Sequence, residues 1–261
     1  MRAIAAGVSD VGRQRLHNED RYMLLPEFNV FIVADGMGGH KSGEVASRMA
    51  ASAVAGFFRD VGPRRKGSLG ERLRLAVKEA NARIFARSGG SRAHRGMGTT
   101  IVAAAFAPGE GTVYVAHAGD SRCYLVRRGN IRQLTRDHSL LEDALRERPD
   151  LTARDLAYLP RNVITRALGV SETVDVEVRE EPVLPGDVFL LCSDGLHGLV
   201  ADTELARIVG AQPVLTEACA RLVELANERG GRDNITVVLV RIEEGDAGSG
   251  DAARGPSARK E

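Results

Sequence analysis

The sequence predicts an α+β fold in which antiparallel sheets are covered on their outer faces by helices. Two observations support this prediction. Two helical segments, a run of strands, two more helices and a last strand follow one another along the chain, which differs from the regular alternation of a parallel sheet. Several strand segments are short, continuous apolar runs, which is typical of strands buried on both faces.

Length and composition predict one domain. The chain has 261 residues, of which 43% are hydrophobic and 27% are charged, and this is enough to enclose a full core. We predict a single domain over residues 1–243. Residues 244–261 are mostly small and polar, so we predict that they form a disordered tail.

Charge and cysteine content exclude several classes of protein. The 36 basic and 35 acidic residues leave a net charge of +1. The chain therefore lacks the excess of basic residues that is typical of nucleic-acid-binding proteins. Cys123, Cys192 and Cys219 are isolated, which argues against a zinc site or a disulfide framework. The first residues contain no apolar segment of the length that a signal peptide needs, and no apolar run is long enough to span a membrane. We expect a cytoplasmic protein without nucleic-acid or membrane partners, and we expect a monomer.

The first third of the chain predicts three strands and two helices. The strands are expected at residues 3–8, 22–25 and 31–34. A helix is predicted over residues 42–59, because apolar side chains recur at every fourth position from Val45 to Phe57. Ser68 and Glu71 have the spacing of a capping box, which predicts the start of a second helix.

Four strands are predicted next, as an antiparallel meander. They are expected at residues 99–106, 112–118, 121–127 and 131–134, joined by short turns that contain glycine. The segment that follows is polar and contains Pro149, Pro160 and only short helix signals. Long insertions of this kind usually have a function, so residues 139–168 are predicted to form a lid or recognition flap.

The last third predicts strands and helices around a second apolar run. The strands are expected at residues 173–179, 188–192 and 235–242, and the helices at residues 203–209 and 213–228. The run at residues 188–192 resembles the run at residues 31–34, because an aspartate and a glycine follow each of them closely. The same pattern, an apolar strand followed by an aspartate and a glycine, therefore occurs twice at distant positions in the chain.

Aspartates lie at one end of four of these strands. Asp35 follows an apolar run and precedes Gly36, a pair that on its own is typical of a simple turn. Asp194 ends the second apolar run, Asp120 follows a third strand and Asp233 precedes a fourth. If these strands are neighbours in one sheet or across two sheets, their carboxylates converge. Such a cluster needs a cation to stay ionised.

The candidate ligands indicate a type of metal and a type of chemistry. Carboxylates without paired histidines or cysteines favour Mg²⁺ or Mn²⁺. Two such ions bridged by one carboxylate can activate a water and neutralise a phosphoryl group, and Asp35 is the candidate bridge. Arg15, four residues before Glu19, is suited to bind the phosphate. The alternative for Arg15 is an ordinary surface arginine.

Eight ordered motifs carry a resemblance to a known family. They are SDVGRQRLHNED (residues 9–20), ADGMGGHKSGEVAS (34–47), GMGTT (96–100), AGDSR (118–122), LTRDHS (134–139), NVITRALG (162–169), CSDGL (192–196) and GRDNITVV (231–238). In this order they resemble the metal-dependent protein phosphatases of type 2C, in their bacterial branch. The resemblance spans about residues 7–242.

The resemblance implies a fold and a set of metal ligands. The fold would be a central sandwich of two antiparallel sheets flanked by pairs of helices, with four layers in the order α-β-β-α. Two inner ions, Mn²⁺ or Mg²⁺, are implied, with a position for a third. Asp35, Asp194 and Asp233 would bind one inner ion, and Asp35 with the carbonyl of Gly36 would bind the other.

The same resemblance implies roles for other residues. Glu19 and Asp20 would hold metal-bound waters, and Arg15 would hold the substrate phosphate. Asp120 would match the position of the third ion. Residues 139–168 would match the flap beside the active site.

One position departs from many eukaryotic members of the family. They have a histidine, proposed as the general acid, directly after the Asp-Gly pair, whereas this chain has Met37, as bacterial members commonly do. A thioether cannot donate a proton. Our hypothesis is that Asp120 holds a third ion whose water supplies the proton. His40 is the competing donor and could contact the phosphate, although packing at the helix start is an equal alternative.

The leading hypothesis is a protein serine/threonine phosphatase in which a water that bridges the metal ions attacks phosphorus directly. It would reverse signalling by bacterial serine/threonine kinases, and its partners would be phosphorylated proteins, including the kinases and their substrates. The alternative is a catalytically weak regulator of the same fold that binds phosphoproteins. Loss of a metal carboxylate would favour that alternative, and none is lost. A phosphodiesterase acting on nucleic acid is disfavoured by the balanced charge.

Overall fold

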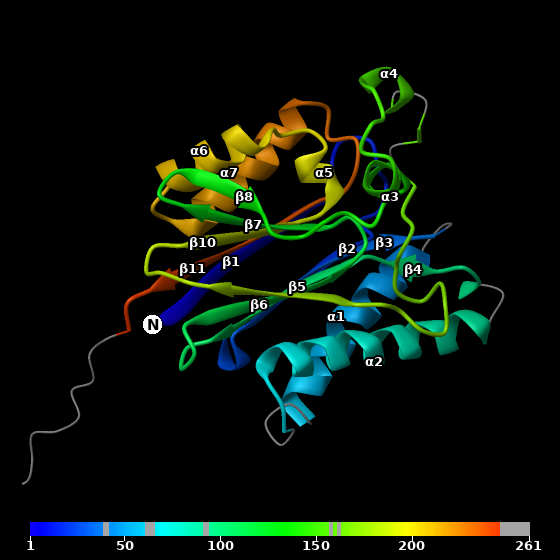
Figure 1. The fold of residues 1–261 in the computed structure, drawn as a ribbon, viewed down its shortest axis with the longest axis horizontal. Helices are drawn as coiled ribbons and strands as arrows, with labels where there is room; N and C mark the ends of the chain where they lie inside the picture. Colours follow the sequence, from blue (N-terminus) through cyan, green and yellow to red (C-terminus); the bar gives the residue numbers. More distant parts are fainter. Residues whose placement is uncertain (39–41, 61–65, 91–93, 157–158, 161–162, 246–261) are drawn as a thin grey trace, which may run out of the picture.

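Two antiparallel β-sheets lie face to face in the computed structural model of the protein, and helices cover the outer face of each sheet (Figure 1). The structure describes residues 1–38, 42–60, 66–90, 94–156, 159–160 and 163–245. The layers confirm the predicted α+β sandwich in the order α-β-β-α. His40 and most of the predicted tail, residues 246–261, lie outside the described residues.

The first sheet contains five strands in the order β1-β11-β10-β7-β8. They are β1 (Arg2–Asp10), β7 (Arg122–Arg127), β8 (Asn130–Gln133), β10 (Val188–Cys192) and β11 (Ile235–Glu243). Cys192 at the end of β10 is opposite Val237 near the start of β11. Because these two strands are antiparallel, the residues just after β10 and just before β11 lie at the same edge of the sheet.

The second sheet has the strand order β2-β3-β5-β6-β9, with the short strand β4 paired to the end of β3. Its strands are β2 (Asp20–Leu25), β3 (Val30–Met37), β4 (Gly98–Thr99), β5 (Ile101–Ala107), β6 (Thr112–Ala118) and β9 (Glu177–Pro182). The 3-10 turn η1 (Pro26–Phe28) joins β2 to β3. Here too an antiparallel pair brings a strand start and a strand end together, because Asp20 is opposite Asp35.

Helices bury the outer face of each sheet. The helices on the second sheet are α1 (Ser42–Asp60) and α2 (Leu69–Gly89), and those on the first are α5 (Asp194–His197), α6 (Asp202–Ala211) and α7 (Leu215–Glu228). The predicted capping box is confirmed, because Ser68 and Glu71 exchange two hydrogen bonds at the start of α2. A third apolar cluster, with Phe31, Phe106 and Phe189, fills the space between the two sheets.

The predicted meander of four strands is wrong at its middle. β5 pairs with β6 and β7 pairs with β8, but β6 and β7 belong to different sheets. The chain changes sheets at Gly119, which has a φ of +115° and would place a Cβ atom 2.6 Å from Thr100, so only glycine fits. β6 pairs instead with β9. Asp120 therefore lies where the chain crosses from one sheet to the other.

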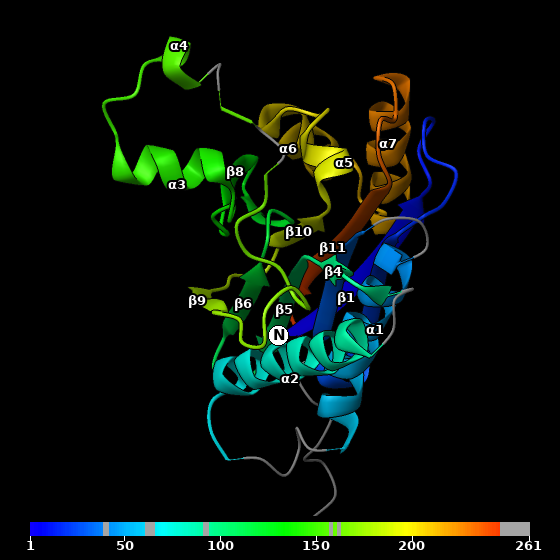
Figure 2. The same cartoon turned by 90° about the vertical axis from the view of Figure 1, so that its right-hand side faces the viewer.

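Residues 139–168, here named the flap segment, contain α3 (Leu140–Glu147) and α4 (Ala153–Leu156), which project from the sandwich (Figure 2). The two ends of the segment are joined, because Ser139 forms an isolated antiparallel bridge with Ile164. Leu168 forms a second bridge with Thr99 of β4. The base of the flap segment is therefore tied to the strand that pairs with the end of β3.

Other predicted elements are present with different boundaries. The strand predicted at residues 173–179 begins only at Glu177, because this edge strand carries charged residues that hide its pattern. The strand predicted at residues 99–106 is divided between β4 and β5. The four-residue helix α5 was not predicted.

No helix within the described ranges combines the length and the apolar character needed to cross a bilayer.

Candidate active site

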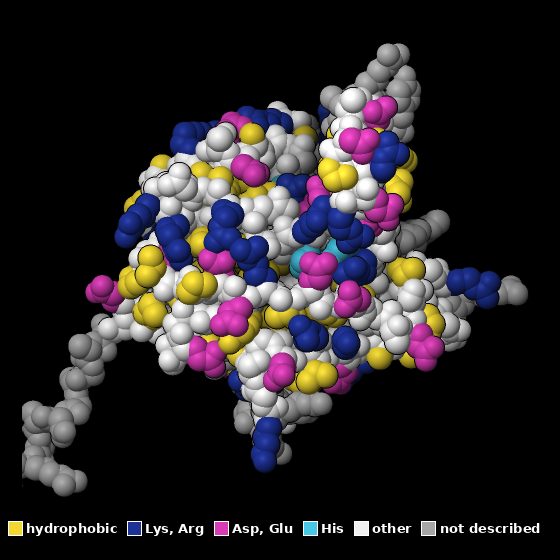
Figure 3. All heavy atoms as spheres, viewed as in Figure 1, with side chains coloured by type: hydrophobic (Ala, Val, Ile, Leu, Met, Phe, Trp, Pro, Cys, Tyr) yellow, Lys and Arg dark blue, Asp and Glu magenta, His cyan; other side chains and the backbone are white. Residues whose placement is uncertain are grey.

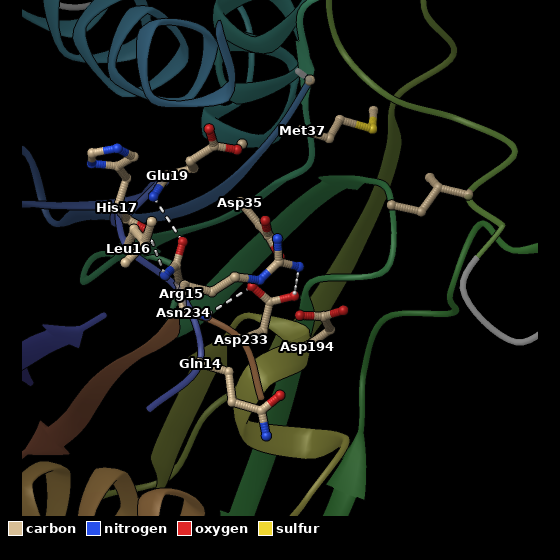
Figure 4. A pocket seen from close by; sticks show the side chains of 13 residues that line it. Gln14, Arg15, Leu16, His17, Glu19, Asp35, Met37, Asp194, Asp233 and Asn234 are labelled. Carbon is tan, nitrogen blue, oxygen red and sulfur yellow. Dashed lines mark hydrogen bonds and ion pairs between the residues drawn. The ribbon is translucent and has the colours of Figure 1, made fainter. Parts of the chain in front are cut away.

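A polar cavity of about 510 Å³ lies where both sheets bring strand ends together. Its lining includes Arg15, Glu19, Asp35, Asp194 and Asp233, which gather around one space in Figure 4. Asp35 lies near the end of β3, Asp194 is the second residue after β10, and Asp233 is the second residue before β11. The sequence predicted that four aspartates at strand ends would converge, and three of them, Asp35, Asp194 and Asp233, line the cavity.

The backbone of Asp35 is fixed by the two threonines of the GMGTT motif. The Asp35 N–H donates to the hydroxyl of Thr100 at 3.1 Å. The Asp35 carbonyl accepts from the N–H of Thr100 and from the hydroxyl of Thr99, both at 2.8 Å. Asp20 is directly opposite Asp35 on the neighbouring strand, an arrangement that is unfavourable for two like charges.

Gly36 lets three backbone segments meet beside the cavity. A Cβ atom at this position would lie 2.2 Å from the carbonyl oxygen of Gly43 and 2.6 Å from that of Glu19. The Gly36 N–H donates to the Glu19 carbonyl at 3.2 Å, and the Ser47 hydroxyl donates to the same oxygen at 2.5 Å. The end of β3, the start of α1 and the loop before β2 are thus packed together, which requires glycine at position 36.

Ser193 connects the two sheets next to the cavity. It is fully buried and directly precedes Asp194, the first residue of α5. Its hydroxyl donates to the carboxylate of Asp20 at 2.7 Å and accepts from the N–H of Thr236 at 3.0 Å. Because Asp20 belongs to the second sheet and Thr236 to the first, this hydroxyl fixes the relative positions of the carboxylates.

Asn234 holds the loop before β2 against the start of β11. Its amide group donates to the carbonyls of Val11 and His17, both at 3.0 Å, and its oxygen accepts from the Glu19 N–H at 2.7 Å. Sequence reasoning missed this role, although the Asp-Asn pair before the last strand was a usable signal. The loop and its side chains are therefore held at one edge of the cavity.

Arg15 lies in this loop and forms an ion pair with Asp233 at 2.7 Å (Figure 4). The hydrogen bond to Asp233 and the negative charge of its carboxylate raise the pKa of Arg15. The Arg15 side chain is 56% exposed, so part of the guanidinium remains accessible from the cavity. The predicted phosphate-binding group thus contacts a predicted metal ligand directly.

Asp120 is not part of the cavity lining. Its carbonyl accepts a hydrogen bond from Nε2 of His197 at 3.0 Å. Burial, followed by the charge of Asp194, raises the pKa of Asp120 to about 7. The charge of Asp120 in turn contributes to the raised pKa of Asp35. Asp120 therefore lies within electrostatic reach of the cavity, although it does not line it.

The buried carboxyl groups fit a site for hard cations. Burial raises the pKa of Asp35 well above its usual value, and the charges of neighbouring carboxylates add to this effect. Burial also raises the pKa of Asp20, to about 7, and that of Asp194. One oxygen atom each of Asp20, Asp120 and Asp194 is buried without a hydrogen-bond partner among the described residues. Burying a carboxylate oxygen without a hydrogen-bond partner is unfavourable. A bound cation would supply the missing partner, and Mg²⁺ and Mn²⁺ prefer carboxylate oxygen ligands.

Apolar side chains also line the cavity, and two of them come from β3 and from the flap segment. Met37 comes from the end of β3, and Ile164 comes from the flap segment. The flap segment therefore reaches the cavity at Ile164. His40 lies outside the described residues.

A second group of potential ligands lies away from the cavity. Single ligand atoms of His117, His138 and Glu177 lie within 4.8 Å of one another. The two imidazole rings are stacked, with centroids 4.6 Å apart and planes 6° apart, so their in-plane lone pairs cannot converge on one ion. Arg166 also contacts Nε2 of His138 at 3.0 Å. A guanidinium in this place makes the group a hydrogen-bonded junction between the flap segment and β9 rather than a cation site.

Comparisons with known proteins agree with this fold and give its family. The family model described as "Protein phosphatase 2C" matches residues 12–239. The serine/threonine phosphatase stp of Listeria monocytogenes is 39% identical over 237 residues, which are 89% of this chain and 93% of that protein.

Solved structures give the same result. The serine/threonine phosphatase PstP/Ppp of Mycobacterium tuberculosis has a TM-score of 0.84 at 36% identity, covering 94% of this chain and 100% of that chain. The catalytic domain of PstP in complex with two manganese ions has a TM-score of 0.80 at 35% identity. The match covers 93% of this chain and 99% of that chain. Family profile, sequence and structure thus agree over nearly the whole chain, which belongs to the protein phosphatase 2C family.

Proposed function

We propose that the cavity is the active site of a protein serine/threonine phosphatase that uses Mn²⁺ or Mg²⁺. The observation that carries this proposal is the convergence of Asp35, Asp194 and Asp233 beside Arg15. Hard carboxylate ligands next to a guanidinium suit metal-assisted hydrolysis of a phosphoryl group. The relatives named above are described as serine/threonine phosphatases, and one is in complex with manganese.

The proposed metal ligands are those that the family resemblance implies. They are Asp35, Asp194 and Asp233 for one inner ion, and Asp35 with the carbonyl of Gly36 for the other. Glu19 and Asp20 would act through bound waters, and the hydrogen bond from Ser193 orients Asp20 for this role. Bound ions would acidify a water for direct attack on phosphorus and neutralise the phosphoryl oxygens.

Arg15 is proposed to bind the substrate phosphate. Its guanidinium bonds to Asp233 in this structure, and a cation at Asp233 would compete for the same carboxylate. Arg15 would then offer a planar, bidentate donor to the phosphate. Because Arg15 and Asp35 line the same cavity, a phosphate held there would lie beside the proposed bridging carboxylate.

Asp120 is proposed to help protonate the leaving group. The alkoxide of serine or threonine is a poor leaving group and needs a proton as its bond to phosphorus breaks. Met37 lines the cavity but has no proton to donate. Asp120 would hold a third ion, whose bound water would supply the proton.

The proposed substrates are phosphorylated proteins, and the reaction would reverse phosphorylation by bacterial serine/threonine kinases. All of the proposed ligands come from one chain, so a monomer would be sufficient for activity. The flap segment would contact the phosphoprotein, because its residue Ile164 lines the cavity. The alternative, a regulator that binds phosphoproteins without turnover, is disfavoured because every proposed metal carboxylate is retained.

The test is release of phosphate from phosphoserine and phosphothreonine peptides by the purified protein. We expect release with Mn²⁺ or Mg²⁺ and none with excess chelator, with activity restored when the metal is added back. Stoichiometric peptide binding without turnover would favour the regulator. Undiminished turnover in excess chelator would contradict the proposed metal-dependent mechanism.

A further inference from the structure

Leu16 is the most exposed large apolar side chain in the part of the chain that the structure describes. It is 91% exposed, whereas the other exposed large apolar side chains range from 36% to 59%. Single exposed apolar residues are common on protein surfaces and need no explanation by themselves. What distinguishes Leu16 is its position.

Leu16 lines the catalytic cavity directly after Arg15. Figure 4 shows Leu16 and Met37 on opposite sides of the cavity, with Arg15 and Asp35 between them. Ile164 of the flap segment lines the same space. A strongly polar floor thus has apolar side chains at its margin, a combination typical of sites that bind a ligand with one charged and one apolar part.

The loop that carries Leu16 is fixed on both sides. The N–H groups of Arg13 and Gln14 donate to the carbonyl of Gly231 at 2.8 and 3.2 Å. The carbonyl of His17 accepts from Asn234 at 3.0 Å. The backbone on each side of Leu16 is therefore held in place before a substrate arrives, which lowers the entropy lost on binding.

We propose that Leu16 forms a subsite for an aliphatic side chain next to the phosphorylated serine or threonine of the substrate. This inference rests on the proposed function and specifies its substrate class. Neighbouring Cα atoms are about 3.8 Å apart, so a residue adjacent to the phosphorylated one can lie over Leu16 while the phosphate contacts Arg15. An aliphatic side chain there covers apolar surface, whereas a charged side chain would lose hydration.

The inference is tested with phosphothreonine peptides that differ only at the positions directly before and after the phosphothreonine. Leucine is placed at one of these positions in turn and compared with serine and with lysine, and an aryl phosphate serves as a substrate without flanking residues. For at least one position we expect kcat/KM, relative to the aryl phosphate, to be about threefold to tenfold higher with leucine. The difference should lie mainly in KM.

Variants separate a subsite from a general effect on the enzyme. Leu16→Ala should remove the preference for leucine, and Leu16→Lys should turn it into a preference for serine. Leu184→Ala is the matched control, because Leu184 is 45% exposed but lies outside the cavity lining, and it should keep the wild-type preference.

Absence of the subsite and absence of phosphatase activity give different results in these assays. If the wild type hydrolyses all of the phosphopeptides equally, or if Leu16→Ala keeps the preference, the subsite is refuted while the phosphatase activity stands. If the wild type with Mn²⁺ hydrolyses neither the peptides nor the aryl phosphate, the proposed function fails and the subsite fails with it.

Discussion

Replacement of Asp120 by asparagine should stabilise the metal-free protein at pH 8 and do so much less at pH 5. Burial raises the pKa of Asp120 from 3.8 to about 7. The stability contributed by a carboxyl group of this kind is fully present below about pH 4 and is lost as the pH rises through about 7. Asparagine is uncharged at every pH, so the variant does not lose this contribution.

The size of the effect follows from the two pKa values. The interval from 3.8 to about 7 corresponds to an upper limit of about 4 kcal/mol in the free energy of unfolding at pH 8. Partial exposure of the group to water reduces this to roughly 2 kcal/mol. For a domain of this size we expect Tm to rise by about 4 to 8 °C. The gain should fall by more than half between pH 8 and pH 5.

The assay is thermal or urea unfolding in excess chelator at several pH values from 5 to 8. Asp150→Asn is the control, because Asp150 is exposed and its hydrogen bond to Arg148 lowers its pKa; this variant should not be stabilised at any of these pH values. A gain for Asp120→Asn that does not change with pH, or a loss of stability at pH 8, would refute the account of Asp120 as a buried, repelled carboxyl group.

Three further variants test the proposed roles of single residues. Asp35→Asn should reduce phosphopeptide turnover at least about a hundredfold, as measured by phosphate release with saturating Mn²⁺. Arg15→Ala should raise the KM for phosphopeptides and weaken inhibition by free phosphate about tenfold or more, while calorimetry finds Mn²⁺ affinity equal or higher; a parallel loss of Mn²⁺ affinity would make Arg15 structural. Asp120→Ala should slow phosphothreonine hydrolysis far more than hydrolysis of an aryl phosphate, whose phenolate leaves without a proton. Equal slowing of both substrates would exclude Asp120 as a source of the proton.

Local patterns predicted most of the elements, but not which strands pair. The sequence predicted β6 and the capping box of α2, because apolar runs and cap residues are local signals. The crossing at Gly119 was missed, because the turn looks the same whether the next strand pairs with β6 or joins the other sheet. β9 was placed too early, because its charged residues give no apolar pattern. Strand partners are decided by packing across the whole sandwich, which a single segment does not reveal.

The convergence of carboxylates was predictable, and their supporting contacts were not. Asp35 and Asp194 each follow an apolar run, so the same signal appeared twice in the sequence. The bridge from Ser193 to Asp20 and the ion pair between Arg15 and Asp233 involve residues that are far apart in the chain. Contacts of this kind depend on how the two sheets stack, so only the three-dimensional structure gives them.

The most direct test of the metal site is calorimetric titration of Mn²⁺ into the metal-free wild type, Asp35→Asn and the control Asp150→Asn. Asp35 is the proposed shared ligand, so its replacement should weaken both inner ions together. We predict about two ions per chain for the wild type and for Asp150→Asn, as in the PstP complex with two manganese ions, and a loss of both binding events in Asp35→Asn. Wild-type affinity and stoichiometry in Asp35→Asn would contradict a bridging role for Asp35.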